Sequence, residues 1–402
     1  MTDTQQPKQR RWPQRALIGL VAFAVVFHLA GGWYFSGLIR SDGLEPRAPQ
    51  HDFGVRVAEI GESSIVLDGT DRGMIESPGT FGLWWEGGYG QVGTIRSNND
   101  GAILRDFTTL SGGPPPICLK EDLDQCTEVD LEGYAFPTDP SDVGLAFEEV
   151  TYPSPLGPMG AWLVPPTDGS VTIWAIHMHG WRAERRETVR MLPTYAAAGI
   201  TSLVIDYRND PDAPADPSGL YKFGRTEWQD AEAAVQYALD HGADHVILAG
   251  YSTGATAEMS FLESSPLADR IAGVVFDSPN LDFGRAVSEE ASKRMIPGTP
   301  IPLPGTLTFT AKWIADLRFD VDWGAINYVD RDGILTVPTL VFHGADDQTV
   351  PLSVSEDLEK LYPDLVTLVV TDEADHVGSW NVDRERYTAI LAAYLSTVTT
   401  DN

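Results

Sequence analysis

The pattern of apolar and polar residues along the 402-residue chain begins with one long apolar stretch. From Ala16 to Ile39 there is no Asp, Glu, Lys or Arg, and His28 is the only residue of a type that ionises near neutral pH. At about 1.5 Å per residue, a helix of this length crosses the roughly 30 Å hydrocarbon core of a bilayer. The pattern therefore predicts a transmembrane segment over residues 16–39, preceded by a basic tail at 1–15 and followed by a stalk at 40–52.

The next stretch, residues 53–110, consists of short β-type runs separated by turns. Gly87-Gly88, between Trp84-Trp85 and Tyr89, is typical of a hairpin. We expect a small all-β module here, whose Trp and Tyr side chains either pack in its core or form a ligand platform. A linker and cysteine loop follows over 111–145. The runs are Gly54–Ile60, Ser64–Leu67, Thr80–Trp85, Gln91–Ile95 and Ala102–Phe107.

From residue 146 to 398, apolar runs alternate with stretches of helical periodicity. Near-continuous apolar runs are typical of parallel strands covered on both faces, so the pattern predicts a doubly wound, mostly parallel α/β sheet. The expected strands are Val171–His177, Ser202–Ile205, His245–Ala249, Ile271–Phe276, Thr339–Phe342 and Val366–Val370. The expected helices are Glu187–Ala198, Thr226–His241, Thr256–Ser264, Ser353–Tyr362 and Asp383–Thr397.

An insertion at about 283–330 interrupts this alternation. It contains prolines at positions 297, 300, 302 and 304 and large apolar residues such as Phe309, Trp313 and Ile314. Because it follows a strand of the parallel sheet, we expect it to form a cap over the carboxyl ends of the strands.

The charge of the chain is unevenly distributed. The formal net charge is −30, with +4 in residues 1–40 and −34 in the rest, which argues against nucleic acid as a partner because polyanions repel such a protein. Basic residues before the apolar segment predict a cytoplasmic N-terminus and an extracytoplasmic position for everything after Arg40. The expected location is the cell membrane with a single pass. The alternative is secretion after cleavage of a signal peptide whose apolar core ends near Leu29.

Cys118 and Cys126 are the only cysteines, eight positions apart in a polar stretch. In an oxidising compartment a disulfide between them is the favoured state, whereas two free thiols are the alternative. No His lies near them, so the pair does not indicate a metal site.

The most informative motif is Gly250-Tyr251-Ser252-Thr253-Gly254, which follows an apolar strand and precedes a helical stretch. A G-x-S-x-G pattern in this context predicts a nucleophilic serine on a sharp turn, flanked by Gly250 and Gly254 because larger residues would collide with the backbone. The alternative is a turn of small residues that serves packing alone.

A serine nucleophile requires a base and a carboxylate that orients the base. His376 follows the run Val366–Val370, so it is expected on a loop at the same sheet edge as Ser252. Asp346 and Asp347 follow the run Thr339–Phe342, and adjacent side chains on a turn diverge. We favour Asp347 as the acid, with Asp346 or Asp277 as the alternatives.

On the basis of these motifs, residues 147–398 resemble an α/β-hydrolase of the serine hydrolase type. With its apolar N-terminal segment, the chain looks like a membrane-anchored bacterial member of that family. The segment His343–Pro351 looks like the H-G-x-x-D-x-x-V-P acid turn of that family, and its D-x-x-V-P half selects Asp347. His179-Gly180-Trp181 is similar to the family's oxyanion turn. The resemblance implies that the backbone N–H groups of Trp181 and Thr253 bind the developing oxyanion.

Two other features allow more than one interpretation. His177 and His179 share one face of a strand and could bind a metal, but no third ligand has suitable spacing, so a strand that ends in the oxyanion turn is the favoured interpretation. Arg208 lies at the same sheet edge. It either holds an anionic group of a substrate or pairs with carboxylates of the protein, and we favour the second.

The sequence thus predicts an extracytoplasmic serine hydrolase that cleaves carboxylic esters or thioesters through an acyl-enzyme, without cofactor or metal. Its expected substrates are acyl esters, thioesters or lipids. An acyltransferase acting on envelope lipids or sugars uses the same intermediate and is the first alternative. A serine peptidase and a non-catalytic binding protein are the others.

Overall fold

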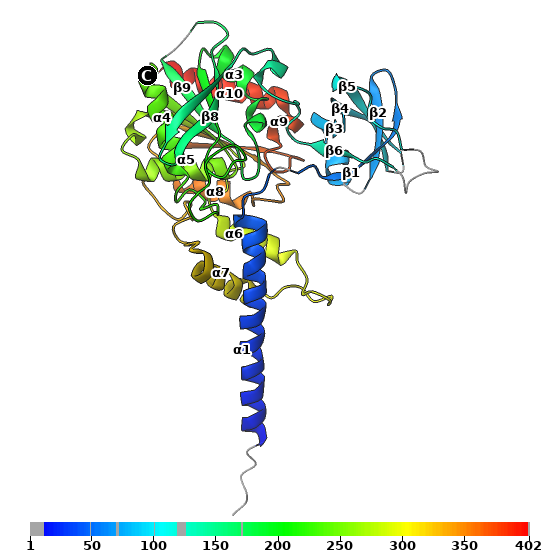
Figure 1. Cartoon of the computed structure of the whole chain (residues 1–402), viewed down its shortest axis with the longest axis vertical. Coiled ribbons are helices and arrows are strands. Elements are labelled where there is room, and N and C mark those ends of the chain that lie inside the picture. The colour runs from blue at the N-terminus through cyan, green and yellow to red at the C-terminus, as the bar shows by residue number, and fades with distance from the viewer. Residues whose placement is uncertain are drawn as a thin grey trace, which may run out of the picture. The chain divides into compact units, whose positions relative to one another are not determined.

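The computed structural model describes residues 12–48, 50–69, 72–99, 101–118, 126–169 and 172–400. Most of the predicted basic tail, residues 1–11, lies outside this range. The chain forms two compact units, one made of Met1–Glu45 with Val287–Trp323 and the other of Pro46–Ala286 with Gly324–Asn402. Their elements are labelled in Figure 1.

The first unit contains α1, Trp12–Leu38, and α7, Gly305–Phe319, which lie side by side. A π-helical turn, Ile39–Leu44, extends α1 into the stretch that the sequence predicted as stalk. Among the described residues, Arg15–Leu44 is the helix that is long and apolar enough to cross a membrane. Its apolar side chains, from Leu17 to Leu29, are largely exposed.

The second unit begins with a closed antiparallel β-barrel in the order β1-β2-β5-β4-β3-β6. Its core contains alternate residues of each strand, including Trp85. For Trp85, the predicted role in core packing is therefore confirmed. The buried Arg105 guanidinium donates to the carbonyls of Gly93, Ile75 and Gly79. The strands are β1 Phe53–Ile60, β2 Ser64–Gly69, β3 Phe81–Trp85, β4 Gly88–Asn99, β5 Ala102–Gly112 and β6 Val129–Glu132, and α2 is Arg72–Glu76.

The last barrel strand corrects the predicted boundary of the β-module. β6 lies within 111–145, which the sequence analysis assigned to a linker, and it closes the barrel by pairing with β1 and β3. Only Val129 and Leu131 point into the core. Two inward residues in a strand of four give too short an alternation to be recognised in a sequence.

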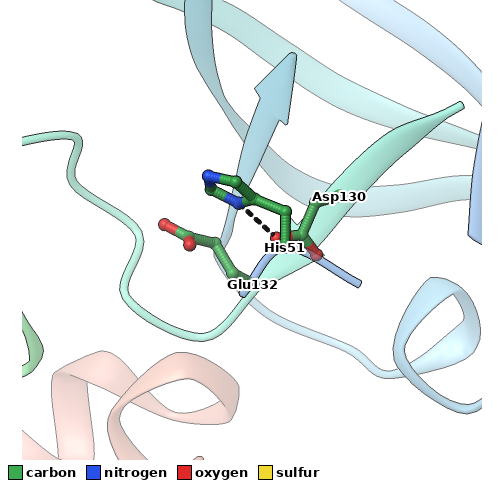
Figure 2. A group of neighbouring side chains, drawn as sticks. All are labelled: His51, Asp130 and Glu132. Atoms are coloured by element: carbon green, nitrogen blue, oxygen red, sulfur yellow. Dashed lines mark hydrogen bonds and ion pairs between the residues drawn. The ribbon is translucent and has the colours of Figure 1, made fainter. Parts of the chain in front are cut away.

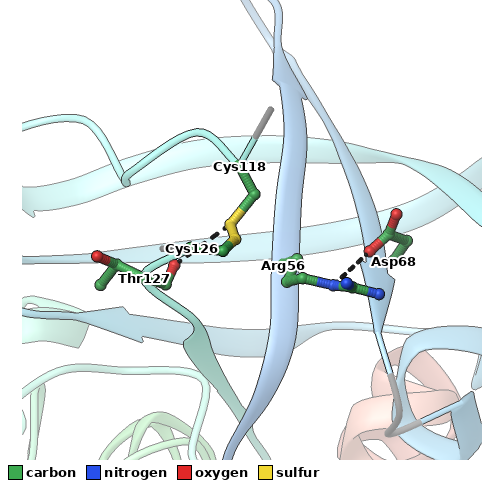
Figure 3. The surroundings of a disulfide bond; sticks show 5 residues. All are labelled: Arg56, Asp68, Cys118, Cys126 and Thr127. Atoms are coloured by element: carbon green, nitrogen blue, oxygen red, sulfur yellow. Dashed lines mark hydrogen bonds and ion pairs between the residues drawn. A yellow bond between two sulfur atoms is a disulfide. The ribbon is translucent and has the colours of Figure 1, made fainter. Parts of the chain in front are cut away.

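The predicted disulfide between Cys118 and Cys126 is present, with a Cα–Cα distance of 5.2 Å. Cys118 N–H donates to Val57 O at 2.7 Å, which ties the disulfide to β1. Figure 3 shows the disulfide near the ion pair between Arg56 and Asp68. Residues 119–125 of the cysteine loop lie outside the described residues.

The rest of the second unit is built on an eight-stranded sheet in the order β14-β13-β12-β11-β9-β10-β8-β7. Strands β9 to β14 form a parallel sheet. Strands β8 and β7 extend this sheet beyond β10 as an antiparallel edge. This confirms the predicted sheet. The strands are β7 Glu148–Ser154, β8 Gly157–Val164, β9 Ile173–Met178, β10 Thr201–Ile205, β11 His245–Tyr251, β12 Ile271–Asp277, β13 Thr339–Gly344 and β14 Val366–Thr371.

Helices cover the sheet and bury its apolar residues. One large core cluster contains Ile247 and Ala249 of β11 together with residues of α3 and α10. Leu248 is also buried and, because side chains alternate along a strand, it points to the other face. These helices are α3 Leu192–Ala197, α4 Trp228–Asp240, α5 Thr253–Ser264, α8 Ser353–Leu361, α9 Ser379–Val382 and α10 Arg384–Thr400. Helix α6, Phe283–Ser292, begins the insertion, and its residues from Val287 onward belong to the first unit.

Two elements differ from the prediction. The expected helix Glu187–Ala198 is instead a 3-10 turn, Arg185–Thr188, followed by the short α3. Pro193 lies in the first turn of α3 and has no N–H to continue a helix that began earlier. The β7–β8 hairpin was not predicted, because β7 is mostly exposed and has no apolar run.

Candidate active site

The structure places Ser252 in a sharp turn between β11 and α5. Its φ and ψ are 50° and −111°, a conformation rare for a residue with a side chain and typical of a strained strand-to-helix turn. A Cβ on Gly250 would lie 2.5 Å from Ala255 Cα, and one on Gly254 would lie 2.0 Å from Met178 O. Both flanking positions therefore require glycine in this turn.

Two hydrogen bonds link Ser252, His376 and Asp347. His376 Nε2 lies 2.8 Å from Ser252 Oγ, and His376 Nδ1 lies 2.8 Å from Asp347 Oδ2. A carboxylate oxygen only accepts, so in the neutral imidazole Nδ1 carries the hydrogen and Nε2 accepts from the serine hydroxyl. Ser252 follows β11, Asp347 follows β13 and His376 follows β14. The structure thus brings together the nucleophile, acid and base that the sequence predicted.

The turn that carries Asp347 fixes the direction of its carboxylate. Oδ1 accepts from the N–H groups of Thr349 and Val350, both at 2.8 Å, which leaves Oδ2 for His376. The alternative acid Asp277 instead accepts from the hydroxyl of Tyr387, at 3.1 Å. The geometry therefore favours Asp347.

Neighbouring charges set the protonation of this group. Burial raises the pKa of Asp347, but the adjacent imidazoles of His376 and His343 outweigh this and hold the pKa below its usual value. Burial lowers the pKa of His376, while the carboxylates of Asp347, Glu187 and Asp277 raise it, and the net pKa lies above 6.5. The carboxylate is thus ionised at neutral pH, and the imidazole is a stronger base than a free histidine.

The predicted oxyanion residues border Ser252. Thr253 is the first residue of α5, so its N–H has no acceptor within the helix. A Cβ on Gly180 would lie 3.2 Å from Ser252 Cβ, which places the Gly180-Trp181 turn against the nucleophile. Glu187 Oε2 accepts from Gly180 N–H at 2.8 Å and holds this turn.

Neither a protein family description nor any curated protein matches the sequence. Among solved structures, the esterase Pf2001 of Pyrococcus furiosus superposes with a TM-score of 0.50 at 19% identity, over 65% of this chain and 94% of the esterase. The chain has the α/β-hydrolase fold. An esterase/lipase from an uncultured bacterium gives a TM-score of 0.45 at 17% identity, over 64% of this chain and 85% of that one. A bacterial membrane phospholipase A gives a TM-score of 0.44 at 18% identity, over 63% of this chain and 87% of the phospholipase.

The α/β-hydrolase domain holds the loop that carries His376 with a buried arginine that the sequence analysis did not single out. Arg190 Nη2 donates to Val377 O at 2.9 Å, and its Nη1 contacts Asn381 Oδ1. Asn381 Nδ2 donates in turn to Thr80 O beside β3 of the barrel, at 2.6 Å. These contacts join segments far apart in the sequence, so only an alignment of homologues could have revealed them.

The two histidines of the Gly180 turn have separate structural roles in the α/β-hydrolase domain. His177 Nε2 lies 3.0 Å from Ser202 Oγ, and burial lowers the pKa of His177 to about 3. Burial also disfavours the charged form of His179, but Asp210 at 3.1 Å raises its pKa to about 9. His177 is thus neutral, whereas His179, Asp206 and Asp210 bring three potential ligand atoms within 4.8 Å of one another. His179 pairs with Asp210, and Asp206 pairs with Arg185 at 2.9 Å, so a cation would have to compete with these ion pairs.

A group of potential metal ligands lies on the barrel, outside the α/β-hydrolase domain. His51, Asp130 and Glu132 bring ligand atoms within 4.8 Å of one another (Figure 2). His51 Nδ1 pairs with Asp130 Oδ2 at 2.8 Å, while Glu132 pairs with Arg186 and accepts from the Tyr89 hydroxyl at 2.6 Å. A cation would have to displace these partners, so the group is explained as an ion-pair network.

Proposed function

We propose that this protein is a membrane-anchored, extracytoplasmic serine hydrolase that cleaves carboxylic ester or thioester bonds. The observation that carries the proposal is the hydrogen-bonded series Ser252 Oγ, His376 Nε2 and Nδ1, Asp347 Oδ2, with both distances at 2.8 Å. The likeness to the Pyrococcus furiosus esterase supports the fold alone.

The geometry provides the steps of an acyl transfer. Ser252 Oγ attacks the carbonyl carbon of the ester as its proton passes to His376 Nε2. Asp347 keeps the Nδ1 tautomer in place and stabilises the imidazolium that forms. His376 then gives the proton to the leaving alkoxide or thiolate, which leaves an acyl group on Ser252. A water molecule, activated by the same imidazole, releases the acid.

The developing oxyanion needs donors that are fixed before the reaction begins. We assign this role to the backbone N–H groups of Trp181 and Thr253, which border Ser252 on two sides. The α5 N-terminus adds a favourable dipole at the same position. These donors are part of the backbone, so they do not depend on the side chain at 181, whose ring is covered by the Arg182 guanidinium at 3.8 Å.

The first unit and the charge distribution support the proposed location. The helix Arg15–Leu44 anchors the protein, and the basic residues before it favour a cytoplasmic N-terminus. The disulfide between Cys118 and Cys126 is stable in an oxidising compartment, which supports the placement of the barrel and the α/β-hydrolase domain outside the cytoplasm.

An active-site probe tests the function directly. Full-length protein in detergent is treated with a fluorophosphonate, and the modified peptide is identified by mass spectrometry. We expect a single adduct on Ser252 and hydrolysis of p-nitrophenyl esters. A series of acyl chain lengths then defines the substrate class, and added alcohols or sugars as acceptors distinguish an acyltransferase. Absence of the adduct on folded protein would favour the non-catalytic alternative.

The pH profile is a second test, because His376 must be neutral to accept a proton. Its pKa is raised above 6.5, so kcat/KM for a neutral ester should fall as the pH decreases through that raised value. Glu187 contributes to the increase, and Glu187→Gln keeps an acceptor for Gly180 N–H. We expect this variant to move the acidic limb to lower pH.

The matched control for Glu187→Gln is Glu184→Gln, in the same segment but with an exposed carboxylate that pairs with Arg186. Its acidic limb should coincide with that of the wild type. An acidic limb that stays in place in Glu187→Gln, or moves to higher pH, contradicts the assignment of His376 as the base.

A further inference from the structure

The helix α7 in the first unit has an exposed apolar face. Phe309, Trp313 and Leu317 recur at every fourth position, so they share one side of the helix, and they are 73%, 52% and 68% exposed. The opposite side is buried, with Leu307 and Ala311 in the apolar cluster formed with α1. Three large exposed side chains on one helix face mark a surface that needs an apolar partner.

Contacts between the two helices fix their direction and level. A Cβ on Gly31 would lie 2.9 Å from Leu307 Cδ1, so α1 has a small residue where it contacts α7. Further along both helices, Arg318 donates to Ser36 Oγ at 2.7 Å and its guanidinium lies 3.8 Å from the centre of the Trp33 ring. The two helices therefore run in the same direction, with α7 beside the C-terminal half of α1.

The single histidine in the apolar stretch of α1 provides an independent depth marker. His28 Nδ1 donates to Ala24 O at 2.9 Å, and its Nε2 lies 3.0 Å from Thr306 Oγ1. A polar ring in hydrocarbon needs partners within the protein, because lipid tails offer none. Thr306 supplies one, so the beginning of α7 lies at the depth of residue 28.

The distribution of charge agrees with this depth. No charged residue occurs from Met295 to Ala311, which parallels the uncharged stretch of α1. Arg40 is the first charged residue after the uncharged stretch of α1. Its guanidinium lies over the ring of Phe319, the last residue of α7. The chain enters beside Arg294, which pairs with Asp42 at 3.4 Å. Both ends of the segment therefore lie level with the charged end of α1.

The backbone of the loop before α7 is unusually compatible with lipid. Prolines at 297, 300, 302 and 304 have no N–H to leave unpaired. Ile296, Thr299 and Leu303 donate their N–H groups to carbonyls within the segment or at its start, and Ile301 donates to the Thr299 hydroxyl. Irregular backbone at membrane depth requires such internal pairing.

We propose that Met295–Phe319, here called the inserted segment, is a second membrane element that enters the outer leaflet beside α1 and returns to the same side. Phe309, Trp313 and Leu317 contact the acyl chains, Lys312 extends toward the headgroups, and Arg318 is held against Trp33 and Ser36 of α1. The proposal rests on the membrane anchor proposed above and adds to it that the insertion between β12 and β13 is itself embedded in lipid.

Depth-dependent fluorescence quenching tests the proposal on the full chain. Single cysteines replace Phe309, Leu317, Val21 or Ser292 and are labelled with an NBD maleimide, while Cys118 and Cys126 remain in their disulfide and do not react. Each protein is reconstituted in phosphatidylcholine vesicles that contain spin-labelled phosphatidylcholine, with the label near the headgroup or midway along the acyl chain. Val21 reports on the anchor, and the exposed Ser292 of α6 is the control in water.

We expect the spin labels to remove most of the emission from positions 21, 309 and 317 and little from position 292. The midchain label should be the stronger quencher at 309, and the headgroup label should be the stronger at 317. Quenching at 21 without quenching at 309 and 317 overturns the inserted segment and leaves the anchor intact. If 309 is then also protected from a water-soluble maleimide, the face is covered by protein, as in a cap over the catalytic serine.

Absence of quenching at position 21 contradicts the anchor and the inserted segment together. The hydrolase activity is judged separately, by fluorophosphonate labelling of the same vesicles. If position 21 is not quenched but Ser252 is still labelled, the proposed membrane location is wrong and the proposed serine hydrolase activity is retained.

Discussion

Replacing Ser252 with Ala is expected to lower kcat/KM for a p-nitrophenyl ester by about 10⁴- to 10⁶-fold, because the nucleophile is lost and only binding and the oxyanion donors remain. His376→Ala should cost a similar factor. Asp347→Asn keeps the shape of the acid but stabilises the wrong imidazole tautomer, and we expect a loss on the order of 10⁴-fold. The measurement is steady-state hydrolysis by purified full-length protein, with thermal unfolding to show that each variant is folded.

The three residues should also act as one unit. The double variant Ser252→Ala/His376→Ala is expected to be no slower than Ser252→Ala, because the base has no function without its nucleophile. Asp346→Asn is the matched control, since Asp346 is adjacent to Asp347 but its backbone, not its carboxylate, is bonded to the His376 loop. Full activity of Ser252→Ala would falsify the proposed mechanism. A loss in Asp346→Asn as large as in Asp347→Asn would reassign the acid.

The residues of the candidate site could be predicted because each is encoded by a short local pattern. Ser252 follows an apolar strand between two glycines, and Asp347 was favoured over Asp346 because its D-x-x-V-P context resembles the acid turn of the α/β-hydrolase family. The carboxyl ends of parallel strands meet at one edge, so three loops far apart in sequence could be assigned to one site. Local sequence and sheet topology were sufficient for this part.

The residues that support the site could not be predicted, because their partners are distant in sequence. Arg190 is one of 22 arginines, and only its contacts with Val377 and Asn381 show that it holds the His376 loop. The association of α7 with α1 is similar, because the pairing of His28 with Thr306 spans most of the chain. Such contacts depend on how complete elements pack, which no local pattern contains.

Arg208→Met is expected to cause the largest loss of stability among these variants. The Arg208 guanidinium is 2% exposed and pairs with Asp230, which is fully buried, through Nε to Oδ2 at 2.6 Å and Nη2 to Oδ1 at 3.1 Å. Asp216 and Gln229 accept two more of its five hydrogens, at 3.3 and 3.2 Å. The structure thus agrees with the interpretation that this arginine pairs with carboxylates of the protein.

Removing one partner of a buried ion pair leaves the other charge without compensation, which costs about 3–5 kcal/mol. We expect a lower free energy of unfolding by that amount in urea and a fall in Tm of roughly 10 °C. Lys360→Met is the control, since Lys360 is exposed and its pairs with Glu356 and Asp357 should contribute little.

Steady-state kinetics measured below the unfolding temperature distinguish this structural role of Arg208 from a role in substrate binding. If Arg208 held an anionic group of the substrate, the variant would raise KM for a negatively charged ester and leave KM for a neutral ester unchanged. We expect the ratio of the two KM values to match that of the wild type, because the guanidinium is buried and four of its five hydrogens are used by Asp230, Asp216 and Gln229. A selective rise for the anionic ester, with wild-type stability, would assign Arg208 to the substrate site.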